Sequence, residues 1–206
     1  LGFRCEGEDN DAGEEAAVVV LGTRAHGRVT ALLGTAVPHL LHRATCPVLV
    51  VPERAAAGEP FRRVVVGFDG SPSAQAALRW ALDVAHADPT QLVVLRATDE
   101  RRLPSPWAHV RQSAAELRAE VVACDPRAEH ADVQLVPGNA DTVLPSAAGP
   151  QDLLVVGSRG RGGLKGMLLG SVSAYCVSNP IATVAVVRAD GKPVELRLDE
   201  SSALAD

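Results

Sequence analysis

Residues 153–171 read LLVVGSRGRGGLKGMLLGS, and this stretch decides the fold. The four apolar residues at its start predict a buried strand, and Gly170-Ser171 predicts the start of a helix over residues 171–178. Between them, glycines allow backbone N–H groups to approach an anion, and the helix N-terminus adds unpaired donors. The stretch therefore predicts a strand, a glycine-rich loop and a helix that together suit a phosphate.

The loop alone does not identify a ligand, because a surface loop with glycines needs none. It is not a P-loop, since Lys165 is followed by Gly166 rather than by Ser or Thr. It is not the dinucleotide fingerprint either, which follows the first strand of its domain.

A second strand–helix unit lies upstream. Residues 64–67 form a short β-branched run that ends at Asp69 and Gly70, which predicts a buried strand followed by a turn. Ser71-Pro72 then reads as an N-cap followed by proline at the first helical position. Small apolar residues recur at helical spacing after it, so the helix is expected to pack closely on a sheet.

Strands and helices continue to alternate. We predict strands at residues 91–97, 133–136, 153–156 and 183–187, and helices at 107–124, 140–147 and 171–178. Strands that are apolar on both faces indicate a parallel sheet covered on each side. Residues 63–188 are thus predicted to form a Rossmann-like, doubly wound α/β domain with five parallel strands and helices on both faces.

Part of this pattern occurs twice. Residues 18–24 (VVVLGTR) match residues 153–159 (LLVVGSR), and residues 48–51 match residues 184–187 with an offset of 136. The chain therefore begins with a partial β-α-β repeat at residues 17–52. Two strands and one helix bury too little surface to stand alone, so this repeat is expected to pack on the second domain, on a partner or on a portion absent here.

The remaining segments are polar. Residues 1–16 are acidic and expected to be disordered, residues 53–62 read as a linker, and residues 189–206 read as a frayed polar tail. Because the chain starts at Leu1 without an initiator methionine, we expect that an N-terminal portion is missing.

Charge and composition exclude several classes of protein. The net charge is −5, and residues 1–16 supply all of it with six acidic residues against Arg4. The neutral remainder predicts no nucleic-acid partner and no binding to anionic membranes. The apolar runs are far shorter than the roughly 20 residues of a membrane span, and the acidic start is unlike a signal peptide. Four widely spaced cysteines fit a reducing cytoplasm.

The spacing Gly157-x2-Gly160-x9-Gly170-Ser171, with Asp69 ending the first strand, resembles the nucleotide-binding motif of the universal stress protein family. The phrases GSRGRGG at residues 157–163 and LGSVS at residues 169–173 are similar to that family's signature almost word for word. The resemblance covers residues 63–188 and the final third of a second such domain at residues 17–52.

The resemblance implies an ATP-binding domain of a tandem universal stress protein, with Mg²⁺ accompanying the nucleotide. Asp69 would lie by the ribose, and Gly67 and Ala97 would offer backbone contacts around the adenosine. Without the family, the alternative is that Asp69 is a turn residue that caps the helix at Ser71. The loop and the helix start would hold the triphosphate through Gly157, Ser158, Arg159, Gly160, Arg161, Gly162, Gly163, Gly170, Ser171, Val172 and Ser173.

The first copy departs from the family pattern. Ala25 stands where the second loop has Gly160, the loop is one residue shorter, and the strand that should supply an aspartate is missing. We therefore do not expect a nucleotide site there. The family also implies homodimers or tandem pseudo-dimers that associate through the last strand, so residues 47–51 are expected to pair beside residues 183–187.

No catalytic constellation stands out, so the chain is predicted to be no enzyme beyond slow hydrolysis of bound ATP. His39 and His42 are three residues apart but have no third ligand, so no metal site is predicted. The leading hypothesis is a cytoplasmic stress-response module whose conformation or dimerisation depends on ATP. The alternative is a dimerising scaffold of the same fold that binds no nucleotide.

Overall fold

The computed structural model describes residues 18–23, 44, 46–53, 55, 60–98, 114–161 and 169–189. These residues form one seven-stranded sheet in the order β1-β2-β7-β6-β3-β4-β5. The strands are β1 (Val19–Gly22), β2 (Val48–Val51), β3 (Arg63–Gly67), β4 (Gln91–Thr98), β5 (Asp132–Pro137), β6 (Leu153–Gly157) and β7 (Thr183–Val187). The helices are α2 (Pro72–Ala87), α3 (Ala114–Cys124), the 3-10 helix η2 (Pro126–His130), α4 (Ala140–Ala147) and α5 (Ser171–Ser178).

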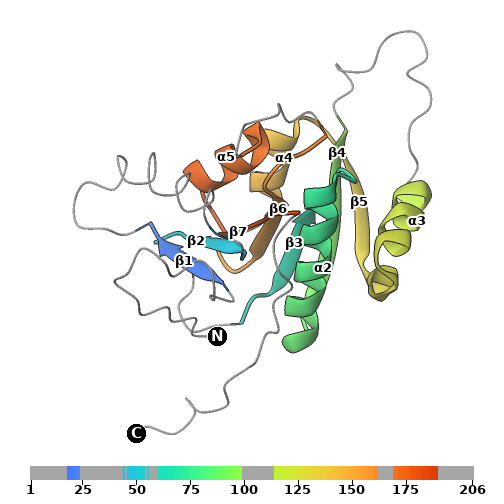
Figure 1. Cartoon of the computed structure of the whole chain (residues 1–206), viewed down its shortest axis with the longest axis horizontal. Helices are drawn as coiled ribbons and strands as arrows, with labels where there is room; N and C mark the ends of the chain where they lie inside the picture. The colour runs from blue at the N-terminus through green and yellow to red at the C-terminus, as the bar shows by residue number, and fades with distance from the viewer. Residues whose placement is uncertain are drawn as a thin grey trace, which may run out of the picture.

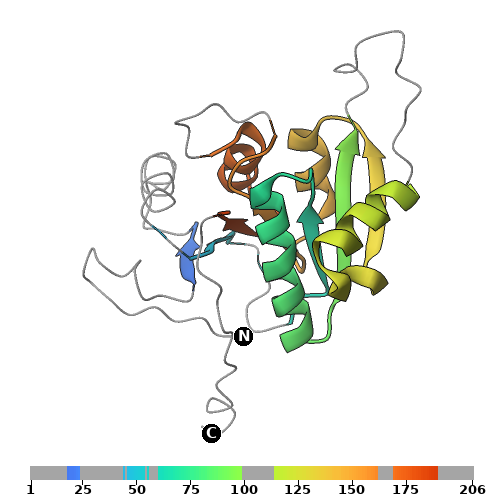
Figure 2. The ribbon, with the colours of Figure 1, turned by 45° about the vertical axis from the view of Figure 1, so that its right-hand side comes forward.

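The five strands β7, β6, β3, β4 and β5 are all parallel. Helices α2 and α3 cover one face of this part of the sheet, and α4 and α5 cover the other (Figures 1 and 2). The prediction of a doubly wound α/β fold with five parallel strands is therefore confirmed. The chain moves outward from β3 to β4 and β5, then crosses to β6 on the other side of β3.

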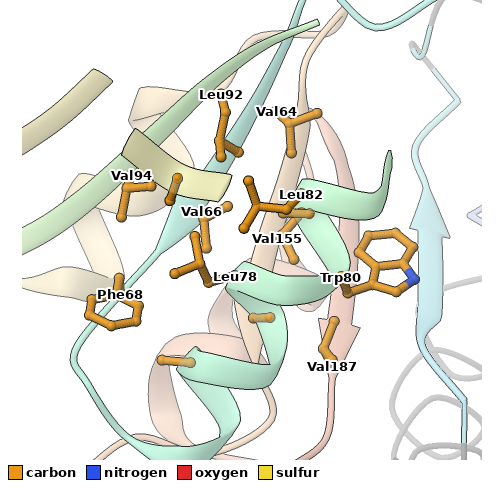
Figure 3. Packing of buried hydrophobic residues seen from close by; sticks show 14 of the residues in the cluster. Val64, Val66, Phe68, Leu78, Trp80, Leu82, Leu92, Val94, Val155 and Val187 are labelled. Atoms are coloured by element: carbon orange, nitrogen blue, oxygen red, sulfur yellow. The ribbon is translucent and has the colours of Figure 1, made fainter. Parts of the chain in front are cut away.

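Successive side chains along each strand point to opposite faces of the sheet, so the molecule has two hydrophobic cores. Val64 and Val66 face α2 and α3, while Val65 between them faces α4 and α5, and all three have no exposed surface. Figure 3 shows Leu78 and Leu82 of α2 among the strand residues of the first core. The central strands β3, β6 and β7 are apolar on both faces, and both of those faces are buried.

The partial repeat extends the same sheet. β1 and β2 are parallel to each other, and β2 pairs antiparallel with β7 through Val48↔Val186, Leu49↔Ala185 and Val50↔Val184. The expected pairing of residues 47–51 beside the last strand is thus observed within one chain. The central pair of this register is Leu49 and Ala185, and these two residues occupy equivalent positions in the two copies of the repeat.

Helices α4 and α5 and strand β7 have the predicted bounds, and strands β3 to β6 differ from the prediction by one residue at one end or at both. The expected helix at residues 107–124 is seen from Ala114 onward, and its first part lies outside the described residues. The expectations for residues 1–16 and 190–206, and for His39 and His42, also lie outside them. Within the described part of the chain, no helix is long and apolar enough to cross a membrane.

Candidate functional site

The candidate site lies where the strand order reverses. β3 has β6 on one side and β4 on the other, so the carboxyl ends of β3 and β6 flank a topological switch point. Open parallel sheets bind their ligands at such points. Asp69 follows β3, and the glycine-rich loop begins at Gly157 at the end of β6.

Asp69 joins the two segments. Its Oδ1 accepts a hydrogen bond from the backbone N–H of Ser71 at 2.9 Å, and its Oδ2 accepts one from the backbone N–H of Arg161 at 2.9 Å. The Ser71 hydroxyl donates to the carbonyl of Arg159 at 3.2 Å and accepts from Ala74 at 3.3 Å as the N-cap of α2. The turn after β3 is therefore hydrogen-bonded to the loop after β6.

Two glycines make this close approach possible. A Cβ at Gly157 would lie 2.7 Å from the backbone carbonyl carbon of Ser73, in the first turn of α2. A Cβ at Gly160 would lie 2.7 Å from Oδ2 of Asp69. Glycine at position 160 thus lets the loop backbone approach the Asp69 carboxylate, where any side chain would push against it.

The start of α5 is fixed to the same loop. The backbone N–H of Gly170 donates to the carbonyl of Ser158 at 2.8 Å, and the N–H of Ser158 donates to Val187 of β7 at 2.8 Å. The buried hydroxyl of Ser173 donates to the carbonyl of Ser158 at 2.9 Å. α5 begins at Ser171 after Gly170, which has no side chain to cap the amides of the first turn.

Known proteins are similar to this chain in sequence and in fold. The model of the Universal stress protein family matches residues 60–188, which is more than half of the chain. The chain belongs to the universal stress protein family. The universal stress protein Rv1996 of Mycobacterium tuberculosis is 35% identical over 206 aligned residues, which cover 87% of this chain and 61% of that protein. A universal stress protein of Mycolicibacterium smegmatis is also 35% identical, with 86% of this chain and 64% of that protein covered.

The chain thus spans about three fifths of the length of these relatives. Two solved structures share the fold. A universal stress protein from Archaeoglobus fulgidus has a TM-score of 0.58 and 24% identity, over 86% of this chain and 62% of that one. A protein described as a putative universal stress protein from Pseudomonas aeruginosa has a TM-score of 0.61 and 20% identity, over 85% of this chain and 64% of that one.

The predicted site residues of this universal stress protein domain fall into three groups. The structure brings together Asp69, Gly157, Ser158, Arg159, Gly160, Arg161, Gly170, Ser171, Val172 and Ser173 around the ends of β3 and β6 and the start of α5. Gly67 and Ala97 lie at the ends of β3 and β4, where a Cβ at Gly67 would lie 2.8 Å from Leu144 and Ala97 pairs with Val136. Gly162 and Gly163 lie outside the described residues.

Ser158 and Ser173 stabilise the structure of the loop. Ser158 is 4% exposed and Ser173 is 2% exposed, and their polar groups bond to each other and to the neighbouring backbone. They stabilise the turn from β6 into α5. The outer surface of the loop is formed by Arg159, Gly160 and Arg161, which are exposed.

The sequence reasoning missed an ionic cluster beside the loop. Arg96 of β4 donates to both carboxylate oxygens of Glu120 on α3, at 2.8 and 3.0 Å, and the guanidinium of Arg161 reaches the same carboxylate at 3.3 Å. The signal in the sequence was an arginine within the apolar strand at residues 91–98. A buried or half-buried arginine needs a partner, but the sequence does not say which.

The residues present fit an anionic nucleotide. The loop offers a residue without a side chain at Gly160, a cation at Arg161 and the first-turn amides of α5, and the last two are the donors that phosphates need. Both oxygens of Asp69 already accept one backbone hydrogen bond, and each keeps a lone pair for a ribose hydroxyl. Among the described residues, no three His, Cys, Asp or Glu side chains are grouped as metal ligands would be.

Proposed function

We propose that this chain is an ATP-binding regulatory module of the cytoplasm, which responds to stress through a nucleotide-dependent conformation. The observation that carries the proposal is the hydrogen bond from the backbone of Arg161 to Asp69, at the switch point between β3 and β6. It places the carboxylate suited to a ribose directly beside the loop suited to phosphates. We expect Mg²⁺ to be bound through the nucleotide and not by a cluster of protein carboxylates.

Nucleotide binding would act on the fold through the same contacts. The loop is bonded to α2 through Ser71, to β7 through Ser158 and to α5 through Gly170. A ligand that rearranges the loop would therefore change the position of α5 relative to β7. This route links the site to the strand that pairs with β2.

The test is calorimetric titration of the purified chain with ATP and Mg²⁺, after removal of any nucleotide carried through purification. Gly160→Ala is the decisive variant, because its Cβ would displace the Asp69 carboxylate, which is a side chain that can turn away. Loss of one charged hydrogen bond to the ligand predicts an affinity about 10-fold to 100-fold lower. Gly149→Ala is the matched control, since its Cβ would meet Oδ2 of Asp152 at an ordinary 3.7 Å.

Two results would refute the ATP site. One is a folded wild-type chain that binds no ATP, and the other is a Gly160→Ala variant that binds as tightly as Gly149→Ala. Turnover of ATP in the same samples would show whether slow hydrolysis accompanies binding.

The second candidate is a dimerising scaffold of the same fold, which binds no nucleotide and acts through its dimer surface. It is favoured by the bonds of Asp69, because they hold the turn and the loop together without a ligand. It is also favoured by the antiparallel pairing of β2 with β7, which forms a pseudo-dimer within the chain. We propose that the chain associates through the last strand as a tandem pseudo-dimer and not as a homodimer.

A further inference from the structure

The cluster of Arg96, Glu120 and Arg161 lies beside the loop that we propose binds phosphate. Two guanidinium groups share one carboxylate, so the cluster carries a net charge of one positive unit. Arg161 is the member that belongs to the loop. Its backbone N–H is bound by Asp69 and its side chain by Glu120, so the residue is held at both ends.

The two ion pairs of Glu120 differ in strength. Arg96 binds the carboxylate in a two-pronged arrangement, its side chain is 11% exposed, and its Nε also donates to the carbonyl of Phe68 at 2.9 Å. The guanidinium lies 5.4 Å from the centre of the Phe68 ring as well. Arg161 makes one bond of 3.3 Å to Glu120, and its side chain is 64% exposed. The pair with Arg161 is therefore the one that an incoming anion can break.

Glycine at position 70 leaves room for the ion pair between Arg161 and Glu120. Its φ is +78°, which favours glycine, and a Cβ there would collide with Oε1 of Glu120 and with the guanidinium of Arg161. The side chain of Arg161 thus crosses directly over the turn after β3 to reach α3. It passes the same turn that positions Asp69.

We propose that Glu120 competes with the phosphates of the nucleotide for Arg161 and so sets the affinity of the site. The inference rests on the proposed function, because it assumes that the loop binds a nucleotide. In the free protein Arg161 is paired with Glu120, and a bound nucleotide must take the guanidinium from that carboxylate. Arg96 keeps Glu120 in place, so the competitor stays next to the site throughout.

Loss of the Glu120 charge is expected to strengthen ATP binding rather than weaken it. Replacing Glu120 by Gln removes the competing charge, while the amide oxygen can still accept from Arg96. An exposed pair of this kind is worth a factor of about two to five in an equilibrium constant, so E120Q should bind ATP about two to five times more tightly. A carboxylate that only supported the loop would give weaker binding when it is replaced.

The experiment is a double-mutant cycle in the buffer in which the wild-type chain binds ATP. The variants are E120Q, R161Q and E120Q/R161Q, and E129Q is the control that removes an equal charge from an exposed position on η2. We expect tighter binding in E120Q, weaker binding in R161Q, no further gain from E120Q in the R161Q background, and no change in E129Q. Thermal unfolding of each variant checks the fold.

A second measurement uses the wild-type chain alone. In nitrogen-15 NMR of the arginine side chains, ATP should shift the Nε signal of Arg161 and leave that of Arg96 in place. Unchanged or weaker binding in E120Q, an equal gain in the R161Q background, or an unmoved Arg161 signal would overturn the proposal while ATP binding stands. A wild-type chain without ATP binding would instead refute the proposed function, and this inference with it.

Discussion

Replacing Gly157 by alanine tests whether the loop and α2 are packed as tightly as the structure shows. The new Cβ would lie 2.7 Å from the carbonyl carbon of Ser73, 2.8 Å from the nitrogen of Ala74 and 2.8 Å from the Cβ of Ser73. Ordinary contacts begin at 3.4 Å, so the closest overlap is about 0.7 Å. Two of the three atoms are backbone in the first turn of a helix, and they cannot move unless α2 or β6 moves.

Overpacking of this kind costs about 1–3 kcal/mol. For a domain of this size, that loss corresponds to a melting temperature lower by about 2–12 °C. The assay is urea denaturation followed by circular dichroism, with the slope of the transition compared between variants. Gly149→Ala should be neutral or slightly stabilising, because its Cβ has room and the unfolded chain loses entropy. A Gly157→Ala variant as stable as Gly149→Ala would refute the tight packing of β6 on α2.

Two further predictions concern titratable groups. The side-chain hydrogen bond from Arg127 holds the pKa of the Asp125 carboxyl below its ordinary value, so its contribution to stability is present above about pH 4 and is lost as the pH falls through the lowered pKa. Asp125→Asn should therefore cost about 1 kcal/mol at pH 7 and less in acid, which urea titrations at several pH values would detect. Burial raises the pKa of Cys176 to about 12, and its side chain is 1% exposed. In a variant that keeps Cys176 as its single cysteine, a thiol reagent at pH 8 should react only as fast as the chain unfolds, and rapid labelling would contradict this.

Much of the fold follows from local patterns. Residues 64–67 and 153–156 are β-branched or apolar throughout, and such runs form strands that are buried on both faces. Ser71-Pro72 gave the start of α2 because capping and the fixed φ of proline act within one turn. The helix at residues 140–147 was found despite Pro145, which lies in its last turns.

The candidate site was less predictable because its contacts are distant in sequence. Asp69 and Arg161 are 92 residues apart, and Arg96 and Glu120 are 24 residues apart. Glycine spacing identifies a loop that can approach an anion, but the direction in which each side chain points depends on the elements packed around it. Ser158 and Ser173 therefore match the sequence motif, but the motif does not show that both residues point inward. Their bonds to β7 and within the turn into α5 determine that orientation.

The register between β2 and β7 bears on how this chain can associate. Leu49 pairs with Ala185, its repeat counterpart, and the flanking pairs Val48↔Val186 and Val50↔Val184 are exchanged by a half-turn about that centre. This is the arrangement of a two-fold interface in which the same surface is used twice. Here one copy of that surface comes from the partial repeat, so the edge of β7 is already occupied. A second chain could use it only by displacing β2, whose residues Val48 to Val50 are at most 3% exposed, and burial of that extent makes displacement costly. Self-association of this chain through the edge of β7 should therefore be disfavoured as long as β2 is paired there.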